Sequence, residues 1–171
     1  VHGANRLGGN SLLDLVVFGR ASGIFIEKQL SEGITLKEAT EEDIQRAMVG
    51  LNRINESSDG ENAAVLRAEL QTIMQNYFGV FRRGDYMKKG IEKLDDLRLR
   101  VENVYLGDKS SSFNTARLEA LELQNLFETA YATAISAEGR TESRGAHARE
   151  DFQERDDENW LCHSIYFPGS K

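Results

Sequence analysis

The chain has 171 residues, of which 40% are hydrophobic and 29% charged, and its formal net charge is −7 at pH 7. This composition is that of a folded chain with one domain or slightly more, and the acidic balance argues against a nucleic-acid-binding surface, which needs a basic stripe. The single cysteine, Cys162, excludes an internal disulfide and any site built from several thiolates, and we expect it to be a small apolar core residue.

The first predicted helix begins at Ser11 and runs to about Leu30, before Gly33. Asn10 or Ser11 is expected to cap it, which would leave its first backbone N–H groups open to an anion or a carbonyl oxygen. Apolar residues lie on almost every side of this helix, a pattern typical of a helix buried inside a larger body. Charged residues interrupt its apolar run, so it does not read as a membrane span.

A second predicted helix follows Thr40, its expected N-cap, and continues to about Glu56. Residues 57–60 combine two serines, an aspartate and a glycine, which is typical of a turn or linker. We therefore expect a domain boundary there, between residues 1–57 and residues 58–171.

Three long helices are predicted in the second part, over residues 62–77, 86–106 and 114–138. Asp85 and Asn114 are the expected caps of the last two. The short connections predict an antiparallel three-helix bundle, so the fold class is mainly α. The side chains expected in its core are Leu66, Leu70, Ile73, Tyr77, Ile91, Leu94, Leu97, Val101, Val104, Leu118, Leu121, Leu126 and Tyr131.

After Gly139 the helical periodicity ends and a charged tail, residues 139–171, begins. Two interpretations of its dense mixed charges stay open: a solvated loop, or a docking strap whose arginines and carboxylates pair with another domain. For His147 we expect a hydrogen bond across a domain interface. Residues 161–167 are compatible with a short terminal strand.

Two stretches of the chain carry a resemblance to a known family. The first is HGANRLGGNSLLDLVVFGR, residues 2–20, and the second is ESRGAHARED with RDDENW, residues 142–151 and 155–160. Both resemble the flavoprotein subunits of bacterial succinate dehydrogenase, fumarate reductase and L-aspartate oxidase, and the GGNSLLD version is most similar to succinate dehydrogenase. Gln153 stands where the bacterial proteins usually carry proline.

The resemblance implies a spectrin-repeat-like helical domain, preceded in residues 1–57 by the last helical piece of an FAD-binding domain. It also implies that the intact subunit oxidises succinate to fumarate, with hydride transfer to FAD. By the same resemblance, Arg6 binds a carboxylate of the substrate, a role that suits the planar guanidinium fork. Ser11 and Leu12, with Asn10 beside them, would contact the cofactor.

Other parts of such an enzyme are not found in this sequence. No GxGxxG motif follows a strand, and His2, His147 and His163 lack the spacing of metal ligands, so we expect no catalytic residue and no metal site here. We therefore expect the chain by itself to bind FAD poorly or not at all and to lack dehydrogenase activity. The start at Val1 is consistent with a C-terminal fragment of a longer polypeptide.

The implied partners are succinate or fumarate, the N-terminal part of the same subunit, an iron–sulfur subunit and, indirectly, membrane anchor subunits and quinone. The implied location is the cytoplasmic face of a bacterial inner membrane. Two alternatives remain: a free-standing α-helical interaction module, and a fragment of a fumarate reductase or L-aspartate oxidase. Because the first helix is apolar on all sides, we expect the chain to self-associate.

Overall fold

The computed structural model describes residues 9–168, so the predicted substrate ligand Arg6 lies outside the described residues. The coordinates divide into two compact units, which meet in sequence between Ile44 and Gln45. The expected boundary between residues 1–57 and 58–171 concerns the domains of a larger protein and stays a prediction.

The first unit contains helix α1, Asn10–Ser31. Its N-cap is Gly9, not Asn10 or Ser11 as the sequence suggested, and no side chain caps the helix. Gly9 has a φ of 82°, a left-handed conformation that glycine adopts without steric cost. The apolar side chains of α1 are exposed: Leu12 is 70% and Phe18 53% accessible to solvent.

Helix α2, Glu41–Glu56, begins where Thr40 closes a reciprocal cap. The Thr40 hydroxyl accepts a hydrogen bond from the Asp43 amide at 3.2 Å, and the Thr40 amide donates to the Asp43 carboxylate at 3.1 Å. The predicted cap is thus confirmed. Near its other end, α2 buries Ile54 in the core of the second unit.

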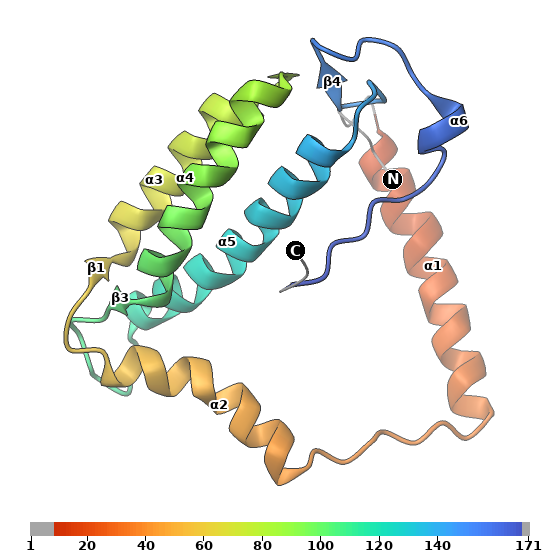
Figure 1. Cartoon of the computed structure of the whole chain (residues 1–171). Coiled ribbons are helices and arrows are strands. Elements are labelled where there is room, and N and C mark those ends of the chain that lie inside the picture. Colours follow the sequence, from red (N-terminus) through yellow and green to blue (C-terminus); the bar gives the residue numbers. More distant parts are fainter. Residues whose placement is uncertain (1–8, 169–171) are drawn as a thin grey trace. The chain divides into compact units, whose positions relative to one another are not determined.

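Helices α3 (Ala63–Phe78), α4 (Gly84–Glu102) and α5 (Thr115–Gly139) pack pairwise as an antiparallel bundle, which confirms the predicted fold class (Figure 1). The expected cap at Asn114 is confirmed, since its side chain accepts from the Arg117 amide at 2.8 Å. Asn62, predicted as the first residue of its helix, is instead its N-cap and accepts from the Ala64 amide at 2.8 Å.

The expected cap at Asp85 is wrong. Helix α4 begins at Gly84, two residues earlier than predicted, with Arg83 at its N-cap, and the side chain of Asp85 pairs with that of Arg83. The carboxylate of Asp151 accepts from the Gly84 amide at 2.9 Å. A residue distant in sequence therefore satisfies the first amide of α4, which no local pattern could indicate.

Two short parallel strand pairs lie at opposite ends of the bundle (Figure 1). Strand β1 (Glu61–Asn62) pairs with β3 (Val104–Tyr105), and β2 (Phe81–Arg82) pairs with β4 (Ala148–Arg149). Because β3 follows α4 directly, this helix ends at Glu102 and not near residue 106 as predicted. A short helix, α6 (Asp157–Trp160), completes the regular structure.

The bundle core follows the predicted faces of α3 and α4, and that of α5 only in part. Leu121 and Tyr131 pack against the core as predicted, but Leu118 and Leu126 are 60% and 41% exposed, so their predicted burial is wrong. The residues that α5 buries are alanines together with Leu123 and Phe127. The buried core residues are Ile54, Ala63, Leu66, Leu70, Ile73, Phe78, Met87, Leu94, Leu97, Val101, Val104, Leu106, Ala120, Leu123, Phe127, Ala130, Ala134 and Ala137.

Two further expectations fail in the tail. Cys162 is exposed, so it is not a core residue. Residues 161–167 form no strand; Tyr166 contacts the ring of Tyr131 edge-on, with 6.1 Å between centroids, and side-chain packing takes the place of a strand ladder.

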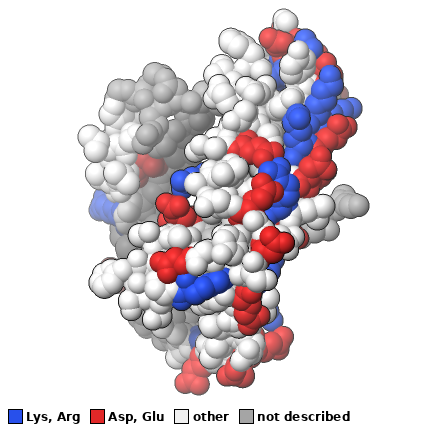
Figure 2. All heavy atoms as spheres, turned by 90° about the vertical axis from the view of Figure 1, so that its left-hand side faces the viewer, with Lys and Arg blue, Asp and Glu red and all other residues white. Residues whose placement is uncertain are grey.

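The outer face of the bundle carries acidic and basic side chains intermixed, as Figure 2 shows. Arg100 on α4, for example, donates to Glu61 and to Glu69 at 2.6–2.8 Å. Within residues 9–168, no helix is both long enough and apolar enough to cross a membrane.

Candidate functional site

The site predicted at the start of the chain is described only in part. Asn10 is the first residue of α1, although its side chain is not described, and Ser11 and Leu12 follow in the first turn. Ser11 is half-buried and Leu12 exposed. The structure therefore places these three residues together at one helix terminus, while the position of Arg6 lies outside the described residues.

The backbone at this terminus suits a group with negative charge. The amides of Leu12 and Leu13 both donate to the Gly9 carbonyl, at 3.0 and 3.2 Å. The amides before Leu12 have no acceptor within the helix, because the first turn of any α-helix lacks one. Gly9 is the N-cap and no side-chain cap is present, and the positive end of the helix dipole at this terminus favours an oxygen with negative charge.

A second cluster of polar side chains lies in residues 140–157, which we call the strap. At its centre Glu142 is fully buried. Its carboxylate accepts hydrogen bonds from Arg140, from Arg144 at 2.7 and 3.0 Å, and from the Asp156 amide at 2.8 Å. These bonds, first among them those from Arg144, lower the pKa of Glu142 to about 2.

Arg149, also buried in the strap, joins the ends of two helices. Its Nη1 donates to the carbonyls of Ala137, Glu138 and Arg140 at 3.0–3.2 Å, so it satisfies acceptors that the C-terminus of α5 leaves open. Its Nε and Nη2 donate to the two oxygens of Asp151 at 2.7 and 2.8 Å. Asp151 in turn accepts from the first amide of α4, so each charge lies at the helix end that favours it.

His147 is held by two arginines of the same unit, not by another domain as expected. Nη1 of Arg82 lies 2.9 Å from Nδ1 of His147, and Nε2 of His147 lies 2.9 Å from the Arg140 carbonyl. Since a guanidinium only donates, Nδ1 must accept and Nε2 must carry the hydrogen. Burial, with the nearby arginines, lowers the pKa of His147, so the neutral ring is favoured.

These contacts decide between the two interpretations of the charged tail. A solvated loop is excluded for the strap, because Glu142 and Arg149 are buried, its ion pairs are made within the strap, and its hydrogen bonds reach the ends of α4 and α5. Pairing of the strap with a further domain stays a prediction. In the part of the chain that the structure describes, no group of histidine, cysteine and carboxylate side chains could hold a metal ion.

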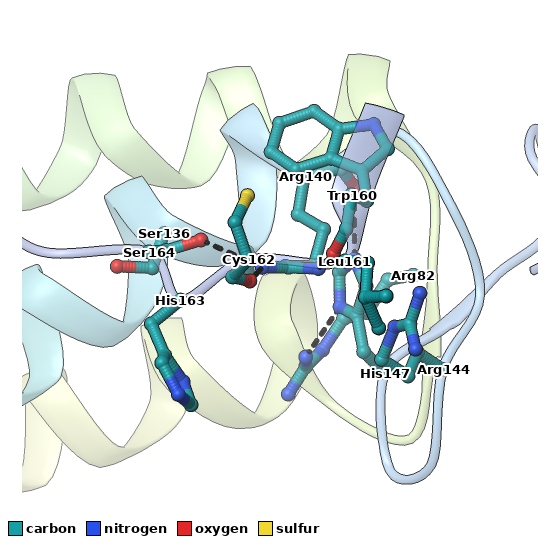
Figure 3. Close-up of a pocket in the computed structure, with 11 residues that line it drawn as sticks. Arg82, Ser136, Arg140, Arg144, His147, Trp160, Leu161, Cys162, His163 and Ser164 are labelled. Atoms are coloured by element: carbon teal, nitrogen blue, oxygen red, sulfur yellow. Dashed lines mark hydrogen bonds between the residues drawn. The ribbon is translucent and has the colours of Figure 1, made fainter. Parts of the chain in front are cut away.

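Beside the strap lies an open pocket of about 490 Å³, shown in Figure 3. Its walls come from the end of α5, from the strap and from residues 160–164. Arg82 of β2 also lines it. The sequence had not indicated this pocket, because its walls come from segments far apart along the chain.

The comparisons with known proteins agree with this architecture. The family described as "Fumarate reductase flavoprotein C-term" matches residues 67–171, which include α4, α5, most of α3 and the strap. The chain belongs to the family of succinate dehydrogenase and fumarate reductase flavoproteins. The resemblance read from residues 2–20 and 142–160 is thereby confirmed.

Individual relatives support the family over almost the whole chain. It is 53% identical over 167 residues to the succinate dehydrogenase flavoprotein subunit of Coxiella burnetii, covering 98% of this chain and 28% of that protein. The fumarate reductase flavoprotein subunit of Haemophilus influenzae is 36% identical over 168 residues, again 98% of this chain and 28% of the relative. The chain thus spans just over a quarter of the length of these curated relatives.

Solved structures give the same result. The Mycobacterium smegmatis Sdh1 complex in its apo form matches with a TM-score of 0.81 and 33% identity, over 91% of this chain and 26% of that one. An E. coli quinol fumarate reductase matches with a TM-score of 0.78 and 40% identity, over 94% of this chain and 28% of that one.

Proposed function

We propose that this chain forms the C-terminal portion of a flavoprotein subunit that oxidises succinate to fumarate. The observation that carries the proposal is its 53% identity, over 98% of the chain, to a succinate dehydrogenase flavoprotein subunit. Because the chain spans only 28% of that relative, the activity belongs to the whole subunit, and the chain alone is inactive.

In this proposal Arg6 binds one carboxylate of succinate and orients the substrate, since a guanidinium offers two parallel donors to a carboxylate. Asn10, Ser11 and Leu12 lie where the cofactor meets the N-terminus of α1. FAD, bound mainly by the rest of the subunit, supplies the hydride acceptor. The fit rests on the backbone at Gly9, which leaves the helix terminus without a capping side chain, and on the exposed Leu12 beside it.

The subunit would work in an assembly. Its partners are the N-terminal part of the same subunit, an iron–sulfur subunit and, through the latter, membrane anchors and quinone, at the cytoplasmic face of a bacterial inner membrane. The related solved structures include an Sdh1 complex and a quinol fumarate reductase with menaquinol molecules, which supports a role in quinone-linked electron transfer.

A second candidate is the reverse reaction, fumarate reduction. It is favoured by the Haemophilus influenzae relative and by the E. coli quinol fumarate reductase, which is 40% identical. The same clamp and helix terminus serve both directions, because the direction depends on electron-transfer partners and flavin potential.

The test is reconstitution. The chain is mixed with the N-terminal portion of the subunit and FAD, and succinate-dependent dye reduction is compared with fumarate-dependent oxidation of a reduced dye. Activity should require both pieces, and Arg6→Ala should lower kcat/KM by about 10- to 100-fold, as expected for loss of a charged hydrogen bond to substrate.

Arg20→Ala is the matched control, since it removes an arginine from α1 beyond the first turn, and it should retain activity. Association without activity would overturn the assigned reaction. Equal activity of the Arg6→Ala and Arg20→Ala variants would overturn the role of Arg6. A faster fumarate-reducing than succinate-oxidising rate would favour the second candidate.

A further inference from the structure

The charged side chains that line the pocket beside the strap are all basic, although two of them, Arg140 and Arg144, are also paired with Glu142. Arg82, Arg140 and Arg144 line it with His147 and His163, and no aspartate or glutamate does. This is unusual in a chain with a net charge of −7. A concave surface lined by charge of one sign concentrates ions of the opposite sign.

Two of these guanidinium groups, those of Arg82 and Arg144, have N–H groups that donate to no acceptor among the described residues. Arg82 uses Nε on the carbonyls of Phe78 and Gly79 and Nη1 on His147, and among residues 9–168 it pairs with no carboxylate. Arg144 binds its carboxylates through Nε and Nη2, which leaves Nη1 without an acceptor among the described residues. The charge of Arg82 is thus half-buried and uncompensated, which disfavours an empty pocket.

Part of the remaining wall is apolar. Ala137, Leu161 and the indole of Trp160 contribute this part, beside the small side chains of Ser136, Cys162 and Ser164, and Leu161 is 71% exposed. The guanidinium of Arg140 lies 5.0 Å from the centroid of the Trp160 ring and fixes that ring in place. Figure 3 shows Trp160 and Leu161 on the same side of the pocket as Arg140. An inorganic anion would leave these apolar walls uncovered.

We propose that this pocket binds a small organic carboxylate, with its charged group at Arg82 and Arg144 and its apolar body against Trp160 and Leu161. The volume of about 490 Å³ lies within the range typical of small-molecule sites, about 300–1,000 Å³. The residues of this site differ from those assigned to substrate and cofactor in the proposed function, and the proposal does not depend on that function.

Trp160 is the single tryptophan of the chain, so its fluorescence reports on this pocket alone. The chain is titrated with cyclohexanecarboxylate, which replaces chloride at constant ionic strength so that screening does not change. We expect a Kd in the millimolar range, so the change in Trp160 emission should saturate below about 20 mM cyclohexanecarboxylate. Phosphate, which lacks the apolar body, and cyclohexylmethanol, which lacks the charge, should each produce no saturable change.

Two pairs of variants locate the site. Ser136→Glu puts a carboxylate on the pocket wall and should weaken binding by about tenfold or more, whereas Thr133→Glu, on the same helix but outside the pocket, should not. Arg82→Gln should weaken binding similarly, and Arg67→Gln on α3 should leave it unchanged. Far-UV circular dichroism checks that each variant keeps its helices.

No saturable response to cyclohexanecarboxylate would overturn the proposal. So would an equal response to phosphate, which would mark an unspecific anion site. An equal loss in Ser136→Glu and Thr133→Glu would also overturn it, because binding would then depend on overall charge and not on this pocket.

Discussion

Helix α1 and the strap are opposites in what they expose. In α1, leucine, valine, isoleucine and phenylalanine side chains face solvent, with Leu12 70% and Phe25 62% exposed. In the strap, Glu142 and Arg149 are buried at 0% and 4% exposure. The apolar side chains of α1 are exposed within residues 9–168, whereas the buried charges of the strap have ion-pair and hydrogen-bond partners.

The difference teaches that burial follows from available partners as much as from polarity. A buried carboxylate or guanidinium is tolerated when hydrogen bonds and opposite charges surround it, as they do at Glu142 and Arg149. Hydrogen bonds and ion pairs cannot stabilise exposed apolar side chains in this way, because only packing against another surface removes them from water. The buried charges of the strap therefore have partners among the described residues, whereas the apolar side chains of α1 are exposed.

The largest expected effect is at Arg149. Arg149→Leu leaves Asp151 and the carbonyls at the end of α5 without their donor, so the free energy of unfolding should fall by about 3–5 kcal/mol in urea denaturation. Arg155→Leu, which removes an exposed arginine paired with Asp157 alone, is the control and should change little. Equal stability of both variants would mean that the strap is not held by buried charge.

The next effect concerns the exposed face of α1. We expect the chain to associate through this helix, and Phe18→Lys should weaken association by about 1.5–3 kcal/mol, the value of burying one large apolar side chain. Light scattering against concentration measures it. As the control, Leu118→Lys changes an apolar residue of the bundle that is similarly exposed, and it should leave the association unchanged. A wild-type chain that is monomeric would contradict the prediction.

Two helix glycines sharpen the same contrast. A Cβ at Gly90 of α4 would lie 2.5 Å from the ring of Phe78 and 2.6 Å from Cβ of Tyr77, so Gly90→Ala should destabilise by about 1–3 kcal/mol. A Cβ at Gly23 of α1 meets nothing within 4 Å, so Gly23→Ala should stabilise that helix by about 0.5–1 kcal/mol. Thermal unfolding followed by circular dichroism measures both changes. If both substitutions stabilised the protein, or both destabilised it, the comparison would be contradicted.

The smallest expected effect is the response of the strap to acid. Glu142 and Asp157 have pKa values lowered to about 2 by hydrogen bonds from arginines, and Asp151 is lowered in the same direction by Arg149. Because the folded pKa lies below the unfolded one, near 4, their stabilisation is complete above about pH 4 and is lost as the pH falls toward 2.

Urea midpoints measured between pH 6 and pH 2 test this response. Glu142→Gln should have a lower urea midpoint at pH 6, and its midpoint should fall less between pH 6 and pH 2, because a carboxyl group with a lowered pKa has been removed. Glu158→Gln, which removes an exposed acid with no ion pair among residues 9–168, should follow the wild-type curve. A Glu142→Gln curve parallel to the wild-type curve would show that Glu142 does not titrate with the fold.

Local signals predicted the parts of the fold that depend on nearby residues. Thr40 and Asn114 cap helices as expected, because a cap involves a side chain and an amide only a few residues away. The predicted cap at Asp85 failed because a residue 67 positions away takes the first amide of α4. The terminal strand at residues 161–167 failed because a strand needs a partner that local alternation does not supply.

The candidate sites divide in the same way. The short motif at Gly9, Asn10 and Ser11 could be read from the sequence, since its residues are adjacent on one helix terminus. The pocket could not, because Arg82, Arg140 and Trp160 are brought together only by the bundle and the strap.

The sequence by itself determined the helices, two of their caps (Thr40 and Asn114), the mainly α bundle and the family, because these depend on periodicity, on neighbours within one turn and on recognisable motifs. Only the tertiary structure decided which face of α5 is buried, where α4 begins and ends, and that Glu142 and Arg149 lie inside. Those outcomes depend on partners distant in sequence, such as the Arg149 guanidinium on the carbonyls of α5 and Asp151 on the first amide of α4.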